Sequence, residues 1–233
     1  MRRALTVAAA VLAISGQAHA ADLPQPGVPV APVPAIYNWN GFYIGVNGGW
    51  GDGLSNWLPS GQNSYSVAGY VFGGTAGYNY QVGAYVWGIE GDFDWTHVVG
   101  NSGQTCGAIS DLVPPTQGCA SQSDWLATFR GRFGYAWANI LLYGTGGVAF
   151  GNVKVGLIPP STFDSTTETG WTIGTGLEVG FAPNWTAKVE YLFVQFPNAT
   201  CSTVGSCGAA AGSAVSFNEN VIRVGINFKF GAW

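Results

Sequence analysis

The feature that most limits the fold of this chain is a two-residue alternation through residues 171–196, interrupted only at Pro183-Asn184. Residues of one parity are bulky and apolar, whereas those of the other parity are mostly Gly and Thr with a few charges. This period predicts two β-strands joined by a tight turn. A soluble sheet usually carries frequent Lys and Glu on its wet face. Small residues there instead indicate a face that points into a narrow barrel, while the bulky face meets lipid.

The same alternation recurs along the chain and predicts eight strands. We expect them at residues 40–50, 66–80, 85–95, 124–136, 140–153, 169–181, 185–196 and 216–230. Long connections (51–65, 96–123, 154–168 and 197–215) alternate with short ones (81–84, 137–139 and 182–184). The fold predicted is therefore all-β, an eight-stranded antiparallel up-and-down transmembrane β-barrel, with both termini at the end where the short turns lie.

The beginning of the chain has the pattern of an export signal. Arg2 and Arg3 precede an apolar run that ends at Ile14, and Ala18-His19-Ala20 supplies the small residues that a signal peptidase needs. We predict a removed signal peptide over residues 1–20. The alternative is a start-anchor helix, but the apolar run falls short of the ~20 residues that span a bilayer. No other segment of the sequence comes close to that length.

The remaining chain is poor in charge and acidic. Only 9% of the residues in the full sequence are charged, against roughly 25% in ordinary soluble domains. Loss of Arg2 and Arg3 lowers the eight basic residues to six against twelve acidic ones, a formal charge of −6, so nucleic acid is not an expected partner. Five prolines between Asp22 and Pro34 predict an extended periplasmic tail over residues 21–38, or a segment that contacts another envelope component. The barrel domain then covers residues 39–233.

The four cysteines form two local pairs in long connections. An exported protein meets an oxidising compartment, so we expect the bridges Cys106–Cys119 and Cys201–Cys207. Crossed bridges or free thiols are the alternatives. Neither a CxxC spacing nor a His partner supports a metal site at these positions.

Four stretches resemble the small outer-membrane β-barrel family: WNGFYIGVNGGWG at 39–51, LLYGTGGVAFG at 141–151, the Ala-Asp-Leu-Pro start at 21–24, and VIRVGINFKF at 221–230. The chain looks most like the porin-like outer-membrane immunogenic proteins and is similar to the OmpA-type eight-stranded barrel. The resemblance implies an integral outer-membrane protein and surface antigen. It also implies contact with outer-membrane lipid and lipopolysaccharide, and insertion by the barrel-assembly machinery. Some relatives are described as stabilising the envelope and a few as haemin binders, roles that do not transfer by fold alone.

The last predicted strand resembles the closing-strand signal that the assembly machinery reads. Its apolar face consists of Ile222, Val224, Ile226, Phe228 and Phe230. In the family this signal normally ends the chain with its aromatic residue, whereas Gly231-Ala232-Trp233 follow here. We favour a signal read at Phe230 with a short tail, because the alternation is intact; Trp233 in the final place after a bulge is the alternative.

Ten charged residues fall on the predicted inner face and balance one another. They are Glu90, Asp92, Asp94, Arg130, Arg132, Glu178, Lys188, Glu190, Arg223 and Lys229. Register counting about the short turns places Glu178 near Lys188, Glu190 level with Arg223, and Glu90 near Arg130 and Arg132. An eight-stranded barrel leaves room for little beyond side chains, so we interpret the set as a salt-bridged polar filling. A proton or ion path is the alternative.

Aromatic residues near strand ends predict interfacial girdles: Trp39, Tyr80, Trp95, Trp125, Tyr135, Trp171 and Trp185. Catalysis has little support, because there is no G-x-S-x-G motif and the mature chain keeps a single histidine, His97. A relay of His97 with Asp94 and Ser102, or metal or haem ligation by His97, is a weaker reading than a solvated loop histidine. We therefore predict no enzyme activity, no cofactor and no metal site.

The sequence favours a structural envelope barrel and surface antigen with a closed lumen. The alternatives are a small-solute porin-like channel and a surface protein that binds haemin, another ligand or a host molecule through its long loops. A soluble ligand-carrying barrel of the lipocalin type needs a charged exterior, for which the mature chain has too few charges. An acyltransferase barrel is a more distant alternative.

Overall fold

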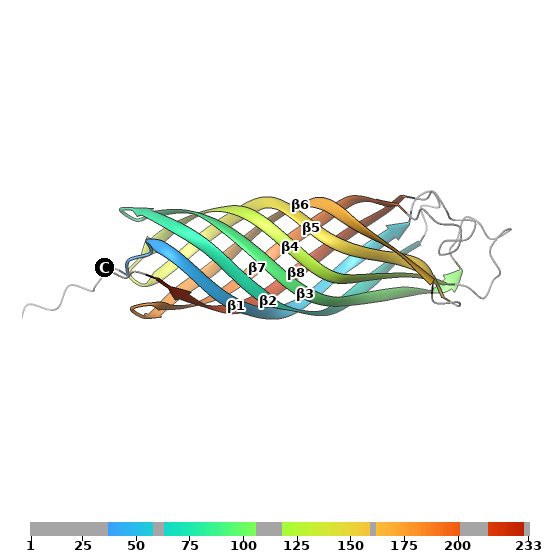
Figure 1. The fold of residues 1–233 in the computed structure, drawn as a ribbon, viewed down its shortest axis with the longest axis horizontal. Coiled ribbons are helices and arrows are strands. Elements are labelled where there is room, and N and C mark those ends of the chain that lie inside the picture. The colour runs from blue at the N-terminus through green and yellow to red at the C-terminus, as the bar shows by residue number, and fades with distance from the viewer. Residues whose placement is uncertain (1–36, 58–62, 106–117, 159–161, 201–213, 231–233) are drawn as a thin grey trace, which may run out of the picture. The chain divides into compact units, whose positions relative to one another are not determined.

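The computed structural model describes residues 37–57, 63–105, 118–158, 162–200 and 214–230. Its strands form one closed antiparallel barrel in the order β1 to β8 (Figure 1). They are β1 (Gly41–Trp57), β2 (Asn63–Val82), β3 (Tyr85–Thr105), β4 (Gly118–Trp137), β5 (Ile140–Ile158), β6 (Thr162–Ala182), β7 (Trp185–Thr200) and β8 (Ala214–Lys229). The predicted fold class is confirmed.

None of the described residues forms a helix that is long and apolar enough to cross a membrane.

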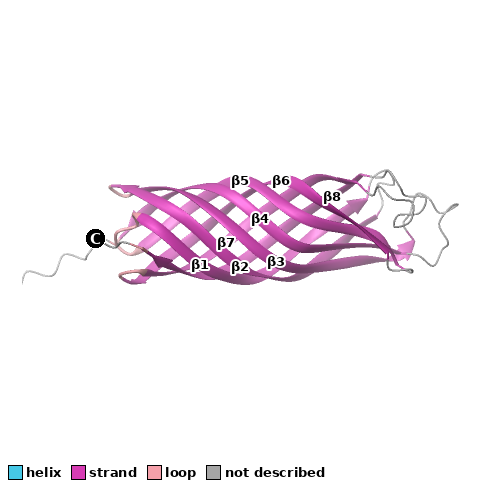
Figure 2. Ribbon diagram, viewed as in Figure 1, coloured by secondary structure: helices cyan, strands magenta, loops and turns pink. Residues whose placement is uncertain are grey.

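The barrel closes because β1 pairs with both β2 and β8, so that Gly49 faces Val71 on one side and Arg223 on the other. Three two-residue turns, centred on residues 83–84, 138–139 and 183–184, lie together at one end (Figure 2). Gly83 and Ala138 have φ values of 61° and 53°, the left-handed conformation that two-residue hairpins use to match strand twist. We call this end the turn end. We call the opposite end, where β1 is followed by β2, β3 by β4, β5 by β6 and β7 by β8, the hairpin end.

The strands extend further toward the hairpin end than the sequence suggested. β3 continues to Thr105 and β6 begins at Thr162, so much of the predicted long connections at 51–65, 96–123 and 154–168 is strand. The strands contain 16 to 21 residues, whereas a tilted strand needs only about 9–11 to cross the hydrocarbon. The prediction of long loops there was wrong, and the surplus is paired sheet.

An apolar belt surrounds the half of the barrel next to the turn end. On β1, Phe42, Ile44, Val46 and Trp50 point outward with 51–66% of their surface exposed. Beyond Trp50 the outward side chains become mostly polar, beginning with Asp52. Ser64, Ser66, Asn101, Ser165 and Thr167 are exposed on the same band of the other strands. The part of each strand inside the belt is the membrane-spanning segment, and the rest projects beyond it.

Most of the predicted girdle aromatics lie on the exterior. Tyr80, Trp95, Tyr135, Trp171 and Trp185 are 44–58% exposed, and Trp125 is half-buried. Trp39 contradicts the prediction, because it is only 1% exposed. It precedes β1 and packs inward against Tyr37, at a ring centroid distance of 4.7 Å.

The interior is filled in three layers. At the turn end lies the cap, a cluster of Tyr37, Trp39, Val86, Ala136, Leu141 and Tyr143. The charged layer follows and holds the predicted lumen charges. Nearer the hairpin end lies the apolar layer: Tyr65, Val67, Val71, Val98, Leu126, Ala149, Val153, Val155, Leu192, Val194, Phe196, Phe217 and Val221. The predicted salt-bridged filling corresponds to the charged layer, whereas the apolar layer was not predicted.

Candidate functional site: the charged layer of the lumen

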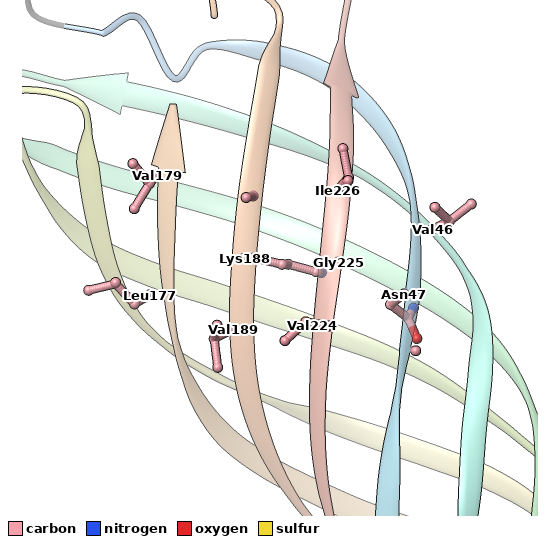
Figure 3. A pocket seen from close by; sticks show the side chains of 11 residues that line it. Val46, Asn47, Leu177, Val179, Lys188, Val189, Val224, Gly225 and Ile226 are labelled. Carbon is pink, nitrogen blue, oxygen red and sulfur yellow. The ribbon is translucent and has the colours of Figure 1, made fainter. Parts of the chain in front are cut away.

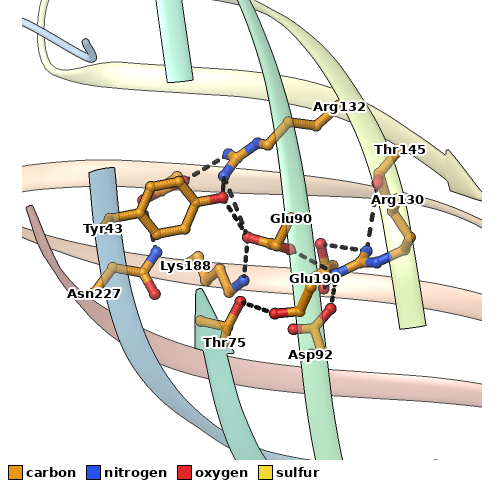
Figure 4. A network of polar contacts seen from close by, with 12 residues as sticks. Tyr43, Thr75, Glu90, Asp92, Arg130, Arg132, Thr145, Lys188, Glu190 and Asn227 are labelled. Atoms are coloured by element: carbon orange, nitrogen blue, oxygen red, sulfur yellow. Dashed lines mark hydrogen bonds and ion pairs between the residues drawn. The ribbon is translucent and has the colours of Figure 1, made fainter. Parts of the chain in front are cut away.

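Arg130 is the centre of the charged layer. Its Nη2 lies 2.6 Å from Glu90 Oε1 and 2.6 Å from Asp92 Oδ2, and its Nη1 lies 3.0 Å from Glu190 Oε1. Nε donates to Thr128 Oγ1 at 3.0 Å. The guanidinium of Arg130 thus joins carboxylates from β3 and β7, which stand on opposite sides of the lumen (Figure 4). Five donors in a fixed planar fork make arginine suited to such a position.

Arg223 on β8 makes the second set of ion pairs. Its Nη1 lies 2.7 Å from Asp94 Oδ2, and its Nη2 lies 2.8 Å from Asp92 Oδ1 and 2.6 Å from Glu190 Oε2. Asp92 and Glu190 therefore each bond both arginines. The side chains of these pairs are at most 1% exposed, and burial of this kind is tolerated only when charges are paired and hydrogen-bonded.

Arg132 connects the charged layer to the cap. Its Nη2 lies 2.7 Å from Glu178 Oε2 and its Nη1 donates to the Tyr43 hydroxyl at 2.9 Å. The guanidinium also stacks 3.9 Å from the centroid of the Tyr143 ring. Tyr43 in turn donates to Glu90 Oε2 at 2.7 Å. This chain of contacts leaves no boundary between aromatic cap and ionic filling.

The predicted partners were right for some residues and wrong for others. Glu190 pairs with Arg223, and Glu90 with Arg130 and, at 3.4 Å, with Arg132. Glu178 and Lys188 are register partners, but Lys188 Nζ lies 3.0 Å from Glu90 Oε2, on a strand across the lumen. The ion pair of Lys188 with Glu90 is favoured because Glu178 is already paired with Arg132, and because the long side chain of Lys188 reaches the centre of the lumen.

Lys229 does not join the charged layer. Its ammonium donates to the Asn38 carbonyl oxygen and lies 4.4 Å from the centroid of the Tyr37 ring. It therefore holds the segment before β1 across the turn end, where the backbone N–H of Trp39 also donates to Gln81 Oε1 at 2.8 Å. Lys229 is buried on the inner face, as predicted, but among the described residues it makes no ion pair with the other lumen charges.

The sequence analysis missed three interior side chains, although their positions in the two-residue alternation place them on the inner face. Tyr43 and Tyr143 alternate with outward apolar residues, and their hydroxyls donate to Glu90 at 2.7 Å and Glu190 at 3.0 Å. Glu219 has the same parity as Arg223 on β8 and is 0% exposed. The sequence analysis considered only charged residues for the lumen, although a narrow lumen also accepts a phenol that supplies a donor.

The remaining predicted residues lie on the exterior or outside the described ranges. His97 is exposed and stacks on Tyr70 at 5.4 Å, whereas Asp94 faces the lumen, so the imagined relay has its members on opposite faces. Of the cysteines, Cys106, Cys201 and Cys207 lie outside the described residues, and only the backbone of Cys119 is described; both bridges stay predictions. Within the described ranges, no group of three or more His, Cys, Asp and Glu side chains is arranged to hold a metal ion.

The closing-strand residues form one outward face, as their parity requires. Ile222, Val224, Ile226 and Phe230 are 47–59% exposed, and Phe228 is half-buried between Trp185 and Phe230, at ring distances of 5.0 and 5.2 Å. Residues 231–233, on which the choice between Phe230 and Trp233 depends, lie outside the described residues.

A shallow groove of about 500 Å³ crosses the belt over β6, β7, β8 and β1 (Figure 3). Small residues, including Gly48, Ala187 and Gly225, form part of its lining, with aliphatic side chains such as Val46 and Val224 around them. The stem of Lys188 lies behind Gly225, where an added Cβ would come within 3.4 Å of it. The lining of the groove is mostly apolar and fits hydrocarbon.

A closed antiparallel barrel with an apolar belt outside and ion-paired filling inside defines a small transmembrane β-barrel. The family model for the outer membrane protein beta-barrel domain matches residues 6–230. The 31 kDa outer-membrane immunogenic protein of Brucella melitensis is 33% identical over 95% of this chain and 96% of its own length. The 22 kDa outer membrane protein of Rhizobium leguminosarum is 33% identical over 86% of this chain and 82% of its own length.

The chain therefore belongs to the outer-membrane β-barrel family. Among solved structures, Neisserial surface protein A resembles it with a TM-score of 0.47 at 11% identity, over 81% of this chain and 97% of that one.

Proposed function

We propose that this protein is a structural component of the cell envelope, an outer-membrane barrel whose lumen is closed and whose hairpin end is displayed as a surface antigen. The turn end, both termini and the tail at residues 21–38 then face the periplasm, after export through the signal peptide of residues 1–20. The closing strand is read by the barrel-assembly machinery, and the belt meets lipid and the acyl chains of lipopolysaccharide. The immunogenic names of the Brucella relatives support the antigen role.

One observation carries the proposal: ionic and apolar layers fill the lumen in series. The side chains of the four bases in the charged layer are at most 1% exposed, and so are the side chains of most of their carboxylate partners. Val67, Val98, Leu192 and Phe217 of the apolar layer are 0% exposed. The charged side chains bond one another across the lumen, and apolar side chains fill the next layer; this filling disfavours the solute-pore and ion-path alternatives.

Conductance of the purified protein in a planar bilayer tests the closed lumen. We expect no steady large conductance, because a solute would have to separate buried ion pairs and then cross an apolar layer. Stable, voltage-independent channels of porin size would overturn the proposal and make solute transport the leading function. Insertion is checked independently by the slower or faster gel mobility of unboiled against boiled samples.

The orientation is tested by labelling single cysteines in intact cells. In a background with the four native cysteines replaced by serine, Thr167→Cys lies on the exposed exterior near the hairpin end and Pro183→Cys lies in a turn. A membrane-impermeant maleimide is expected to label Thr167→Cys in whole cells, and Pro183→Cys only after lysis. The reverse pattern would invert the proposed orientation.

A further inference from the structure

Glu219 lies on the inner face of β8, where the charged layer gives way to the apolar layer. Its register partners are Gly53 on β1 and Val194 on β7. Its outward neighbours Asn218 and Asn220 are polar and lie beyond Ile222, the last exposed apolar residue of β8. Glu219 is therefore outside the membrane-spanning segment, in the projecting part of the barrel.

Within the part of the chain that the structure describes, the Glu219 carboxyl has no polar partner. The side chain is 0% exposed, and neither Oε1 nor Oε2 forms a hydrogen bond with any other described group. Its Oε1 lies over Gly51, where an added Cβ would come within 2.3 Å of that oxygen and 3.2 Å of Val98. Every other buried glutamate of the lumen bonds at least one base. An ionised carboxylate without a partner is the most costly state for such a site.

The groups that face Glu219 do not offer a counter-charge. The charges that act on Glu219 are those of Asp94 on β3 and of Asp52 on the outer side of β1, both acidic. From β7 the inward residues are Leu192, Val194 and Phe196. From β2, the Tyr65 hydroxyl shares a hydrogen bond with Ser121. On β8 itself, the Arg223 guanidinium is bonded to Asp92, Asp94 and Glu190.

Charge counting gives the same result. Among the described inward residues, Glu219 is the sixth acid beside five bases, if Lys229 at the turn end is included. These inward charges sum to zero when one of the six acids carries a proton, and Glu219 is the acid without an ion pair among the described residues. We propose that Glu219 is a proton-binding site whose neutral form keeps the projecting half of the barrel packed, and whose ionisation loosens the apolar layer in response to external pH.

Electrostatics agrees with this placement. Burial, and after it the carboxylates of Asp94 and Asp52, raise the pKa of Glu219 to about 8. Because the folded pKa lies above the unfolded value, the folded state holds a proton that the unfolded state releases between these two values. The contribution of Glu219 to the free energy of unfolding is fully present below the unfolded pKa of about 4.5 and is lost as the pH rises to about 8. Within that window one proton changes the unfolding equilibrium constant about tenfold per pH unit.

The test compares urea unfolding of the full chain in lipid vesicles between about pH 5 and about pH 9 for the wild type, Glu219→Gln and Asp52→Asn. In the wild type we expect the unfolding equilibrium constant to rise with pH up to the folded pKa. Glu219→Gln keeps the shape without the titrating proton, so this component of the slope disappears. Asp52→Asn removes an exposed carboxylate that raises the pKa of Glu219. The unfolding equilibrium constant is therefore still expected to rise with pH, but the rise should end at a lower pH than in the wild type.

Infrared spectroscopy gives a second readout that does not depend on unfolding. The wild type is expected to show a protonated carboxyl band at neutral pH that weakens toward about pH 9 and is missing from Glu219→Gln. A Glu219→Gln variant with the wild-type slope, or with the band intact, would overturn the proton site. The proton site rests on the proposed closed lumen, but the experiments distinguish the failure of one from the failure of the other. A wild-type barrel that conducts steadily, and whose unfolding equilibrium constant still depends on pH through Glu219, would refute the closed lumen and leave the proton site standing.

Discussion

At the residue scale, the charged layer depends on four glycines as much as on its four bases. Each base has a glycine as a register partner on a neighbouring strand. The pairs are Arg130 with Gly147, Arg132 with Gly88, Lys188 with Gly225 and Arg223 with Gly49. An added Cβ at these glycines would meet the backbone or the stem of the base at 2.6–3.4 Å. Glycine therefore provides the space in which a long cationic side chain lies along the wall of a narrow barrel.

This pairing predicts an asymmetry between inward and outward glycines. Gly88→Ala places a Cβ 2.9 Å from Arg132 Cγ and 2.5 Å from Asn79 Oδ1, so we expect a loss of about 1–3 kcal/mol of folding free energy from overpacking. Gly131→Ala is the matched control, because its Cβ would point outward with the nearest atom 4.0 Å away. Urea unfolding in vesicles measures both. Equal losses would show that strand flexibility, rather than space for Arg132, explains the inward glycine.

Val189 tests which face meets hydrocarbon. It is 52% exposed and lies midway along β7 between the outward rings of Trp185 and Phe193, so we expect Val189→Arg to cost about 2–4 kcal/mol of folding free energy in a bilayer. Thr167→Arg, on the polar exterior of β6, is expected to cost about 0–1 kcal/mol. Folding titrations in vesicles compare the two. A larger cost at Thr167 would mean that the belt has been placed on the wrong band of the barrel.

At the element scale, alternation predicted the number, order and pairing of the strands but not their length. Within the belt the outward parity is apolar, as in Phe42 and Ile44. Beyond it the pattern inverts, so that Val153 and Val155 point inward while Asn152 and Lys154 are partly exposed outside. The sequence analysis assigned the bulky apolar residues to the lipid-facing side, and it therefore ended each strand where those residues change to the inner side. This inversion could have indicated that the strand continues beyond the membrane, since paired sheet in water needs an apolar interior.

The candidate site was predictable to the same degree. Parity placed the side chains of Arg130, Glu190 and their neighbours in the lumen, because it depends only on the two-residue period. It did not determine which carboxylate each base bonds. That choice depends on how far a stem reaches across the barrel, as Lys188 shows by bonding Glu90 rather than its register partner Glu178.

The connections at the hairpin end carry a separate prediction. We expect the bridges Cys106–Cys119 and Cys201–Cys207 to form locally, and the barrel to fold without them, because the hydrogen bonds around the ring form independently of loop order. Each bridge adds at most a few kcal/mol. Peptide mapping under non-reducing conditions should return Cys106 joined to Cys119. A peptide that joins Cys106 to Cys201 would mean that the two connections pack together.

At the scale of the whole molecule, the lumen is sealed twice. The charged layer resists solute because separating its ion pairs strands charges in a low-dielectric interior. The apolar layer resists ions because it offers them no hydration. Two seals in series predict that the loss of one does not open the barrel.

Arg130 and Phe196 are the residues that test this arrangement. Arg130→Ala leaves Glu90, Asp92 and Glu190 with one fewer counter-charge and is expected to cost about 3–5 kcal/mol. Phe196→Ala leaves a cavity in the apolar layer at a similar cost of about 3–5 kcal/mol. Each variant alone is expected to show brief leaks at most in a planar bilayer, since the other layer stays intact. The double variant, restricted to the fraction that unboiled gel mobility identifies as folded, is expected to conduct far more than the two single variants together. Steady conductance from Arg130→Ala alone would show that the apolar layer admits ions and that the charged layer is the only seal.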